Sequence, residues 1–363
     1  ASMQISQKTI LEMLECEHVR YAIPLYQRSY AWGPTQAADL LDDLARAGAL
    51  GKAHFLGTFL YNSEPSEDGV ELRVVIDGQQ RITTVSLLVL ALTEIIGKGE
   101  TASSSQLPQA NQLRARYVQE PAGAGAYQPK LRLGEADNAT FRAFVLQEPL
   151  PDDASERILD VYRYFVRRLE GGDINLAQVW TGLSATYLIC AKADAADHTQ
   201  LIFESLNSKG KPLTLADLVR NYLLIAKSHD EQTRLYHEYW APIVGMFQPD
   251  PGTKKLDNAI WAWTNLRFRK ENAHTPGTAY ALLKRYAEDE YTGTLEDLLE
   301  ELRAFCLMWA ENYRYHAVKK FKSSFDWAKN GPKTLVSGRT VKPPSHAGSV
   351  SAADIADQVD ERW

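Results

Sequence analysis

The stretch from residue 72 to residue 96 constrains the fold of this chain more than any other part of its sequence. Residues 72–76 form a short apolar run typical of a buried strand, and Asp77-Gly78 favours a tight turn. Residues 82–96 are apolar and long enough for a core helix. A strand that leads through a tight turn directly into a helix is a building unit of α/β domains. The sequence therefore predicts an α/β domain around this unit.

Short extended and helical stretches alternate on both sides of it. Residues 21–25 are expected to be extended, because the residue before a proline is driven out of the helical region. A helix is predicted to begin at Pro34 and to end at Gly48, with leucines at helical spacing between them. Two further strands are predicted over residues 55–61 and 186–191.

The rest of the chain reads as mostly helical, so the predicted fold class is α/β plus all-α. In residues 158–169 the apolar positions recur at i, i+3, i+4 and i+7, which predicts an amphipathic helix. The 363 residues allow two or three domains. We expect a mixed α/β domain over 1–226 with a mostly helical insertion at about 100–185, a helical domain over 227–325, and a basic linker with the start of a truncated domain over 326–363.

Charge narrows the classes of function. The chain carries 40 Lys and Arg against 46 Asp and Glu, a formal net charge of −6, which argues against a uniformly basic nucleic-acid binder. Charge is unevenly distributed, however, because residues 314–346 hold eight Lys or Arg and one acidic residue. A local basic surface is therefore compatible with the composition.

Cysteine, histidine and apolar content exclude several other classes. The three cysteines lie far apart, which predicts no disulfide framework and fits a reducing cytoplasm. The longest apolar run, 85–92, is shorter than the roughly 20 residues that span a bilayer, so no membrane contact is expected. The eight histidines show no HxxxH spacing, so we expect no zinc site.

The segment Asp77-Gly78-Gln79-Gln80-Arg81 is the strongest candidate for chemistry. A strand-to-helix junction points unpaired backbone N–H groups and the positive end of the helix dipole at one place, where a phosphate is stabilised. Arg81 could bind phosphate oxygens in a bidentate way, the Thr83 or Thr84 hydroxyl could add a hydrogen bond, and Asp77 could hold a metal ion or orient water. No GxxxxGK[ST] or GxGxxG motif is present to explain such a site otherwise. The structural alternative is a turn in which Arg81 pairs with a carboxylate and the glutamines hold the loop backbone.

A second cluster, residues 23–32, has the sequence IPLYQRSYAW and interleaves aromatic side chains with an arginine and a glutamine. Stacking surfaces beside such donors suit nucleotides or a DNA backbone. The alternative is that Tyr30 and Trp32 anchor the core, with Arg28 as their snorkelling neighbour.

A third cluster, residues 203–221, reads as helix, turn and helix. Gly210 and Pro212 end the first helix, and Thr214 with Asp217 forms a capping box for the second, so a structural role is the default. Capping does not require the polar and basic side chains that gather near the turn, which could close over a bound triphosphate. These are Asn207, Lys209, Lys211, Arg220 and Asn221.

The three motifs IPLYQRSYAW, DGQQRITT and FESLNSKGKPLTLADLVRN resemble, in the same order, the hallmark segments of the GmrSD-type restriction-enzyme N-terminal domain. The resemblance covers roughly residues 5–225. It implies a ParB/sulfiredoxin-like fold and a place in modification-dependent restriction, an anti-phage defence. In that family this domain binds and hydrolyses nucleoside triphosphates, and a C-terminal HNH-type nuclease cuts DNA.

Carried onto this sequence, the resemblance implies a nucleoside triphosphatase centre, with Mg²⁺ as a possible cofactor. The expected catalytic residues are Asp77, Gln79, Gln80 and Arg81. The expected nucleotide-binding residues are Gly78, Thr83, Thr84, Asn207, Lys209, Lys211, Arg220 and Asn221. The expected DNA-sensing residues are Pro24, Tyr26, Gln27, Arg28, Tyr30 and Trp32.

The chain departs from the family pattern in one respect: the His-x-x-Pro nuclease motif is missing, and His274-Thr275-Pro276 lacks the spacing and the partners. We therefore expect a sensor half whose partners are its own C-terminal nuclease domain, nucleoside triphosphate, modified DNA and, in an oligomer, further copies of itself. The favoured subtype is an SspE-type sensor of phosphorothioated DNA, whose soft sulfur atom a hollow formed by Pro24, Tyr26 and Tyr30 could prefer. A sensor of glucosylated bases, a non-hydrolysing DNA-binding adaptor with a ParB-like fold and a protein-interaction scaffold remain open alternatives.

Overall fold

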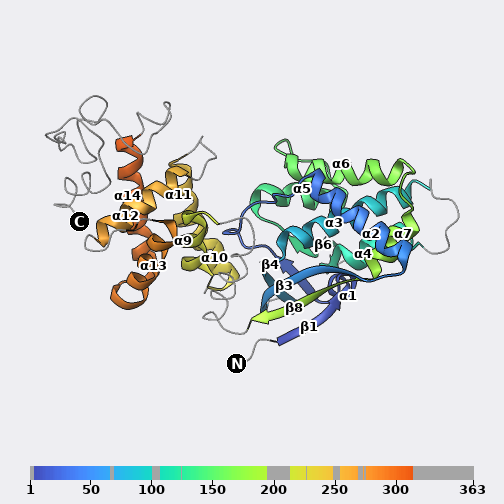
Figure 1. Cartoon of the computed structure of the whole chain (residues 1–363), viewed down its shortest axis with the longest axis horizontal. Coiled ribbons are helices and arrows are strands. Elements are labelled where there is room, and N and C mark those ends of the chain that lie inside the picture. The colour runs from blue at the N-terminus through green and yellow to red at the C-terminus, as the bar shows by residue number, and fades with distance from the viewer. Residues whose placement is uncertain are drawn as a thin grey trace. The chain divides into compact units, whose positions relative to one another are not determined.

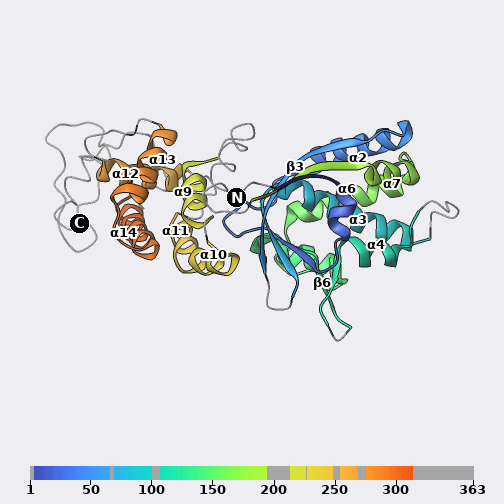
Figure 2. The ribbon, with the colours of Figure 1, turned by 90° about the horizontal axis from the view of Figure 1, so that it is seen from below.

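The chain folds into two compact units, residues 1–206 and residues 207–363 (Figures 1 and 2). The structure is a computed structural model. It describes residues 4–65, 69–99, 107–123, 125–193, 213–225, 227–247, 254–268, 273 and 275–313. The domain bounds predicted from the sequence stay predictions, and the basic stretch 314–346 lies outside the described residues.

Six strands of the first unit form one mixed sheet in the order β1-β8-β3-β4-β2-β7. β3 pairs in parallel with β8 and antiparallel with β4, and β2 lies parallel to β4. The strands predicted over 55–61, 72–76 and 186–191 are confirmed as β3, β4 and β8. The bounds are β1 Gln4–Thr9, β2 Val19–Ala22, β3 His54–Pro65, β4 Glu71–Asp77, β7 Leu131–Arg132 and β8 Thr186–Ala193, with a separate pair formed by β5 Gln119–Pro121 and β6 Tyr127–Pro129.

Helices cover one side of this sheet, where Figures 1 and 2 show α2, α3, α4, α6 and α7 gathered together. Tyr21, Phe59 and Val75 of the sheet belong to the same buried cluster as Leu88 of α3 and Phe165 of α6. The predicted mixed α/β class is confirmed, while the ParB-like assignment stays a prediction. The helix bounds are α1 Ile10–Glu15, α2 Pro34–Leu50, α3 Gln79–Gly97, α4 Ala110–Tyr117, α5 Glu135–Leu146, α6 Glu156–Glu170 and α7 Leu176–Ser184.

The central helix α3 begins directly at the polar turn and runs through the core. It has 19 residues, so it is long and apolar enough to cross a membrane by length and composition alone. The sequence predicted a helix over residues 82–96, and α3 begins three residues earlier, at Gln79. Within its most apolar window, 78% of the helix is buried inside the protein, which is the environment of a core helix in a folded domain.

The predicted end of α2 at Gly48 was wrong, because the helix continues to Leu50 and ends at Gly51, which has the left-handed φ of 60°. Gly48 has a different role at the crossing of α2 and α7. A Cβ atom on Gly48 would lie 1.8 Å from the carbonyl oxygen of Gln178, and one on Gly182 would lie 1.9 Å from that of Leu44. The two glycines allow the helix backbones to touch.

The second unit is helical throughout its described residues, as expected for the chain beyond residue 228. Trp240 and Trp263 are buried in it. The bounds are α9 Leu215–Leu224, α10 His229–Leu235, the π-helical turn η1 Tyr236–Trp240, α11 Ala241–Gly245, α12 Lys254–Arg267, α13 Pro276–Arg285, the π-helical turn η2 Tyr286–Glu290 and α14 Leu295–Tyr313.

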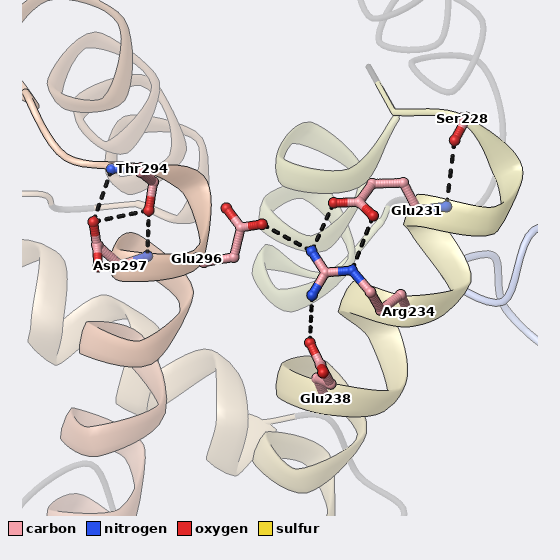
Figure 3. Close-up of polar contacts among 7 residues, drawn as sticks. All are labelled: Ser228, Glu231, Arg234, Glu238, Thr294, Glu296 and Asp297. Atoms are coloured by element: carbon pink, nitrogen blue, oxygen red, sulfur yellow. Dashed lines mark hydrogen bonds and ion pairs between the residues drawn. The ribbon is translucent and has the colours of Figure 1, made fainter.

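Arg234 on α10 forms ion pairs that connect two helices of this unit (Figure 3). The Arg234 guanidinium contacts the carboxylates of Glu231 and Glu238 along its own helical segment, and that of Glu296 at the start of α14. The hydrogen bond from Arg234 holds the pKa of Glu231 below its usual value. These ion pairs therefore hold α10 next to the N-terminal end of α14.

Candidate functional site

The turn between β4 and α3 has a backbone that only glycine adopts easily. Gly78 has a φ of 100°, and a Cβ atom there would lie 2.7 Å from the Phe59 ring. Gly78 is also the N-cap residue of α3, and no side chain among the described residues caps the first turn of this helix. The N–H groups of Gln79, Gln80 and Arg81 therefore form the positive end of a long helix dipole without a capping oxygen. This is the arrangement that stabilises an anion.

Arg81 is held at the same turn by two oxygens. Its Nη1 donates to the carbonyl oxygen of Thr58 at 2.6 Å, and its Nη2 lies 3.4 Å from Oδ2 of Asp77. The side chains of Arg81 and Asp77 are each 26% exposed, so both can still meet a ligand. The sequence-based alternative, in which Arg81 pairs with a carboxylate, thus describes part of its environment.

Gly57 makes room for this guanidinium and was not singled out from the sequence. It lies at a bulge in β3 with a φ of 117°, and a Cβ atom there would lie 2.3 Å from Arg81 Nη1. A glycine inside the predicted strand 55–61 was the available signal, since such a residue often marks a bulge or a close approach.

Two glutamines join the segment 23–32 to this turn. Gln27 Nε2 donates to the carbonyl oxygens of Val75 and Ile76 in β4, at 2.6 and 3.0 Å. Gln80 Oε1 accepts from the backbone N–H groups of Ala31 and Trp32, at 2.9 and 3.2 Å. Gln80 is only 7% exposed. The two motifs that the sequence places about fifty residues apart are therefore one structural unit.

Tyr30 adds a buried connection between the same two motifs. Its hydroxyl lies 2.6 Å from Oγ1 of Thr84, and the Thr84 hydroxyl donates to the carbonyl oxygen of Gln80 at 2.7 Å. Burial raises the pKa of Tyr30 above its ordinary value, against the opposing effect of the Thr84 hydrogen bond. Tyr30 is therefore a neutral phenol that holds the segment on α3.

A carboxylate from the helical layer secures the segment from the other side. Asp137 of α5 accepts from the Tyr30 backbone N–H at 2.7 Å and from the Ser155 hydroxyl at 2.7 Å. Asp137 is buried and lies 107 positions from Tyr30 in the sequence, so no local pattern could have revealed the pair.

Exposure separates the predicted site residues into two groups. Pro24, Tyr26, Tyr30, Thr83 and Thr84 are buried, and Gln80 is nearly so. The side chains that solvent reaches are Asp77, Gln79, Arg81, Gln27 and Trp32, all partly exposed, and Arg28, which is fully in the exposed class. The buried members can position a ligand-binding surface, and the exposed ones can form it.

The third motif falls mainly outside the described residues, which do not include Asn207, Lys209 or Lys211. Arg220 and Asn221 lie on α9 in the second unit. Arg220 pairs with Asp217 at 2.9 Å, and Asn221 is 2% exposed, with no hydrogen-bond partner on its Oδ1 among the residues that the structure describes.

At the N-terminus of α9, side-chain oxygens already accept hydrogen bonds from backbone N–H groups. The predicted capping box is present, because Thr214 and Asp217 bond each other's backbone N–H groups. Asp257 of α12 also accepts from the Ala216 N–H at 2.8 Å. The start of α9 therefore differs from the uncapped start of α3.

No group of three or more His, Cys, Asp or Glu side chains that could hold a metal ion occurs in the part of the chain that the structure describes. At the turn between β4 and α3, Asp77 supplies a carboxylate. Mg²⁺ commonly takes one or two carboxylates and completes its shell with water and substrate phosphate oxygens. Asp77 fits that limited role.

The fold and the site define a mixed α/β domain in which a polar segment is pinned across an uncapped strand-to-helix turn. The family described as GmrSD restriction endonuclease, N-terminal domain, matches residues 10–224, and the chain belongs to this family. The protein is therefore part of a restriction system, and membership of this family indicates an interaction with DNA. A search of curated proteins finds no match to the chain.

Proposed function

We propose that this domain binds and hydrolyses nucleoside triphosphate at the Asp77–Arg81 turn, and that modified DNA controls this reaction. The observation that carries the proposal is the uncapped first turn of α3 beside a partly exposed arginine that two oxygens hold in place. A phosphate placed there would receive backbone N–H groups, the helix dipole and a guanidinium together. The hydrolysis would in turn control a C-terminal nuclease, in keeping with restriction.

The roles follow from which groups face solvent. Arg81 would stabilise the charge that develops on the transferred phosphoryl group, since phosphoryl transfer needs mainly positioning and charge stabilisation. Asp77 would hold Mg²⁺ or orient the attacking water, and Mg²⁺ would neutralise phosphate charge when bound. Gln79 is partly exposed at the first helical position and can reach the ligand. Gln80, Thr83 and Thr84 would act as positioning residues because they are buried.

The same contacts suggest how bound DNA would change the rate of hydrolysis. Arg28 is exposed on the segment whose neighbouring backbone is held by Gln80 and Tyr30. DNA bound at Arg28 would push or pull on a segment that shares hydrogen bonds with the first turn of α3. A phosphorothioate is the modification we favour, because Trp32, four residues after Arg28 in the same segment, supplies a partly exposed apolar surface for a soft sulfur atom.

Phosphate release tests the proposal, measured for each nucleoside triphosphate with no DNA, unmodified DNA and phosphorothioated DNA. We expect turnover with Mg²⁺ that phosphorothioated DNA stimulates. Arg81→Ala should lower turnover at least about 100-fold, as loss of a group that stabilises transition-state charge does. Arg46→Ala is the matched control, because Arg46 is 71% exposed on α2 and, among the described residues, pairs with Asp43 alone.

Each outcome is decisive. Wild-type turnover in a folded Arg81→Ala variant would refute the assignment of the site. Salt-dependent DNA binding without any phosphate release would support the non-hydrolysing adaptor instead.

A further inference from the structure

Most arginines of the first unit are already engaged, and a few are not. Arg73, Arg81, Arg116, Arg142 and Arg168 each pair with a carboxylate. Arg28, Arg132, Arg157, Arg163 and Arg167 are exposed, and their guanidinium groups make no ion pair or hydrogen bond with any residue that the structure describes. Unengaged arginines are the ones available to a ligand.

Three of these arginines lie on or next to the segment 23–32. Arg28 is in its middle. Arg132 is at its beginning, because the Arg132 carbonyl oxygen accepts from the Ile23 N–H at 2.8 Å where β7 joins β2. Arg157, in the first turn of α6, is at its end, with Nη1 3.2 Å from the position that a Cβ atom on Gly33 would take.

We propose that Arg132 and Arg157 bind phosphates of the nucleic-acid backbone on either side of Arg28. This inference rests on the proposed function, which places DNA at Arg28. The segment between them is a rigid support, because Gln27, Tyr30 and the Ala31 and Trp32 N–H groups are all hydrogen-bonded to other elements. Arg132 and Arg157 thus lie next to the two ends of a supported segment that carries Arg28.

Their chemistry suits phosphate, and a DNA duplex placed at Arg28 carries phosphates on either side of that contact. Guanidinium groups bind phosphate oxygens in a bidentate way, and backbone contacts position a protein on DNA without reading its sequence. Arg132 and Arg157 should therefore add affinity without adding preference for modified DNA. The preference should stay with the central segment.

The test is the affinity of the full chain for a short DNA duplex, unmodified or phosphorothioated, at several salt concentrations, measured by fluorescence anisotropy. Arg132→Gln and Arg157→Gln should each weaken binding of both duplexes about 3- to 10-fold and lower the slope of log affinity against log salt by about 1. Neither side chain has a folding partner among the described residues, so the fold should be unchanged, which circular dichroism checks.

Arg167→Gln is the matched control. Arg167 is also exposed on α6 without a partner among the described residues, but it lies about 15 Å further along the helix than Arg157 at 1.5 Å per residue. This variant should keep the wild-type affinity and salt slope.

The inference is overturned if wild-type chain binds DNA in a salt-dependent way while Arg132→Gln and Arg157→Gln behave like Arg167→Gln. That result would leave the proposed function standing. A wild-type chain that binds neither duplex would overturn both the inference and the DNA-sensing part of the proposed function.

Discussion

Replacing Gln80 tests whether its side-chain oxygen holds the segment 23–32 at the first turn of α3. In the structure its Oε1 accepts two backbone hydrogen bonds, from Ala31 at 2.9 Å and from Trp32 at 3.2 Å. Gln80→Met keeps the length and most of the volume of the side chain but removes the acceptor. Gln80→Glu keeps an acceptor oxygen and removes the amide N–H₂ group.

The magnitude follows from the two donors that Met leaves without a partner. An unsatisfied buried donor costs about 1–3 kcal/mol, and both contacts are only partly buried, so we expect the lower part of the summed range, about 2–3 kcal/mol. For a domain of this size that corresponds to a fall in Tm of roughly 4–12 °C. Gln80→Glu should lose much less.

Thermal unfolding followed by circular dichroism measures the shift, and hydrogen exchange at the Ala31 and Trp32 amides locates it. Both amides should exchange faster in Gln80→Met than in Gln80→Glu. A Gln80→Met variant with the wild-type Tm and wild-type exchange at these amides would refute the reasoning. Equal destabilisation by Glu and Met would show that the acceptor oxygen is not what matters.

Two further predictions concern stability. Gly182→Ala should lower the free energy of unfolding by at least about 1–3 kcal/mol, because its Cβ atom would lie 1.9 Å from the Leu44 carbonyl oxygen; denaturant titration checks this, and Gly245→Ala, with nothing within 4 Å, should cause no loss. Asp257→Asn should change the pH dependence of unfolding, because burial, with Asp217 nearby, raises the pKa of the Asp257 carboxyl. The wild-type carboxyl favours folding most at low pH and loses this contribution as pH rises through its raised pKa, so the stability of the variant relative to wild type should increase from about pH 4 upward. A pH-independent difference would contradict the Asp257 prediction.

Local features of this protein were readable from its sequence. The strands β3, β4 and β8 and the helix α3 were predicted from short and long apolar stretches, and the helix α6 from apolar residues at helical spacing, because burial selects apolar side chains at the positions that face the core. The capping box at Thr214 was predicted for a similar reason, since both partners lie within three residues. The motifs that carry the family resemblance are likewise visible as strings of residues, and the family match over residues 10–224 confirms it.

Glycine shows where local reasoning stops. A glycine late in a helix predicts its end, and Gly51 does end α2. Gly48, three positions earlier, instead allows α7 to approach, and Gly57 gives space to the Arg81 guanidinium. Only the packing partner distinguishes these roles, and that partner is far away in the sequence.

The sequence by itself determined which segments become strands and helices, and that the polar residues 77–81 stand at a strand-to-helix junction. The tertiary structure decided which of the site residues are tethers and which face solvent. Gln27, Gln80 and Tyr30 find their partners 48 to 107 positions away. Such partners depend on the order of strands in the sheet and on the helices that cover it, and periodicity within one segment carries no information about either.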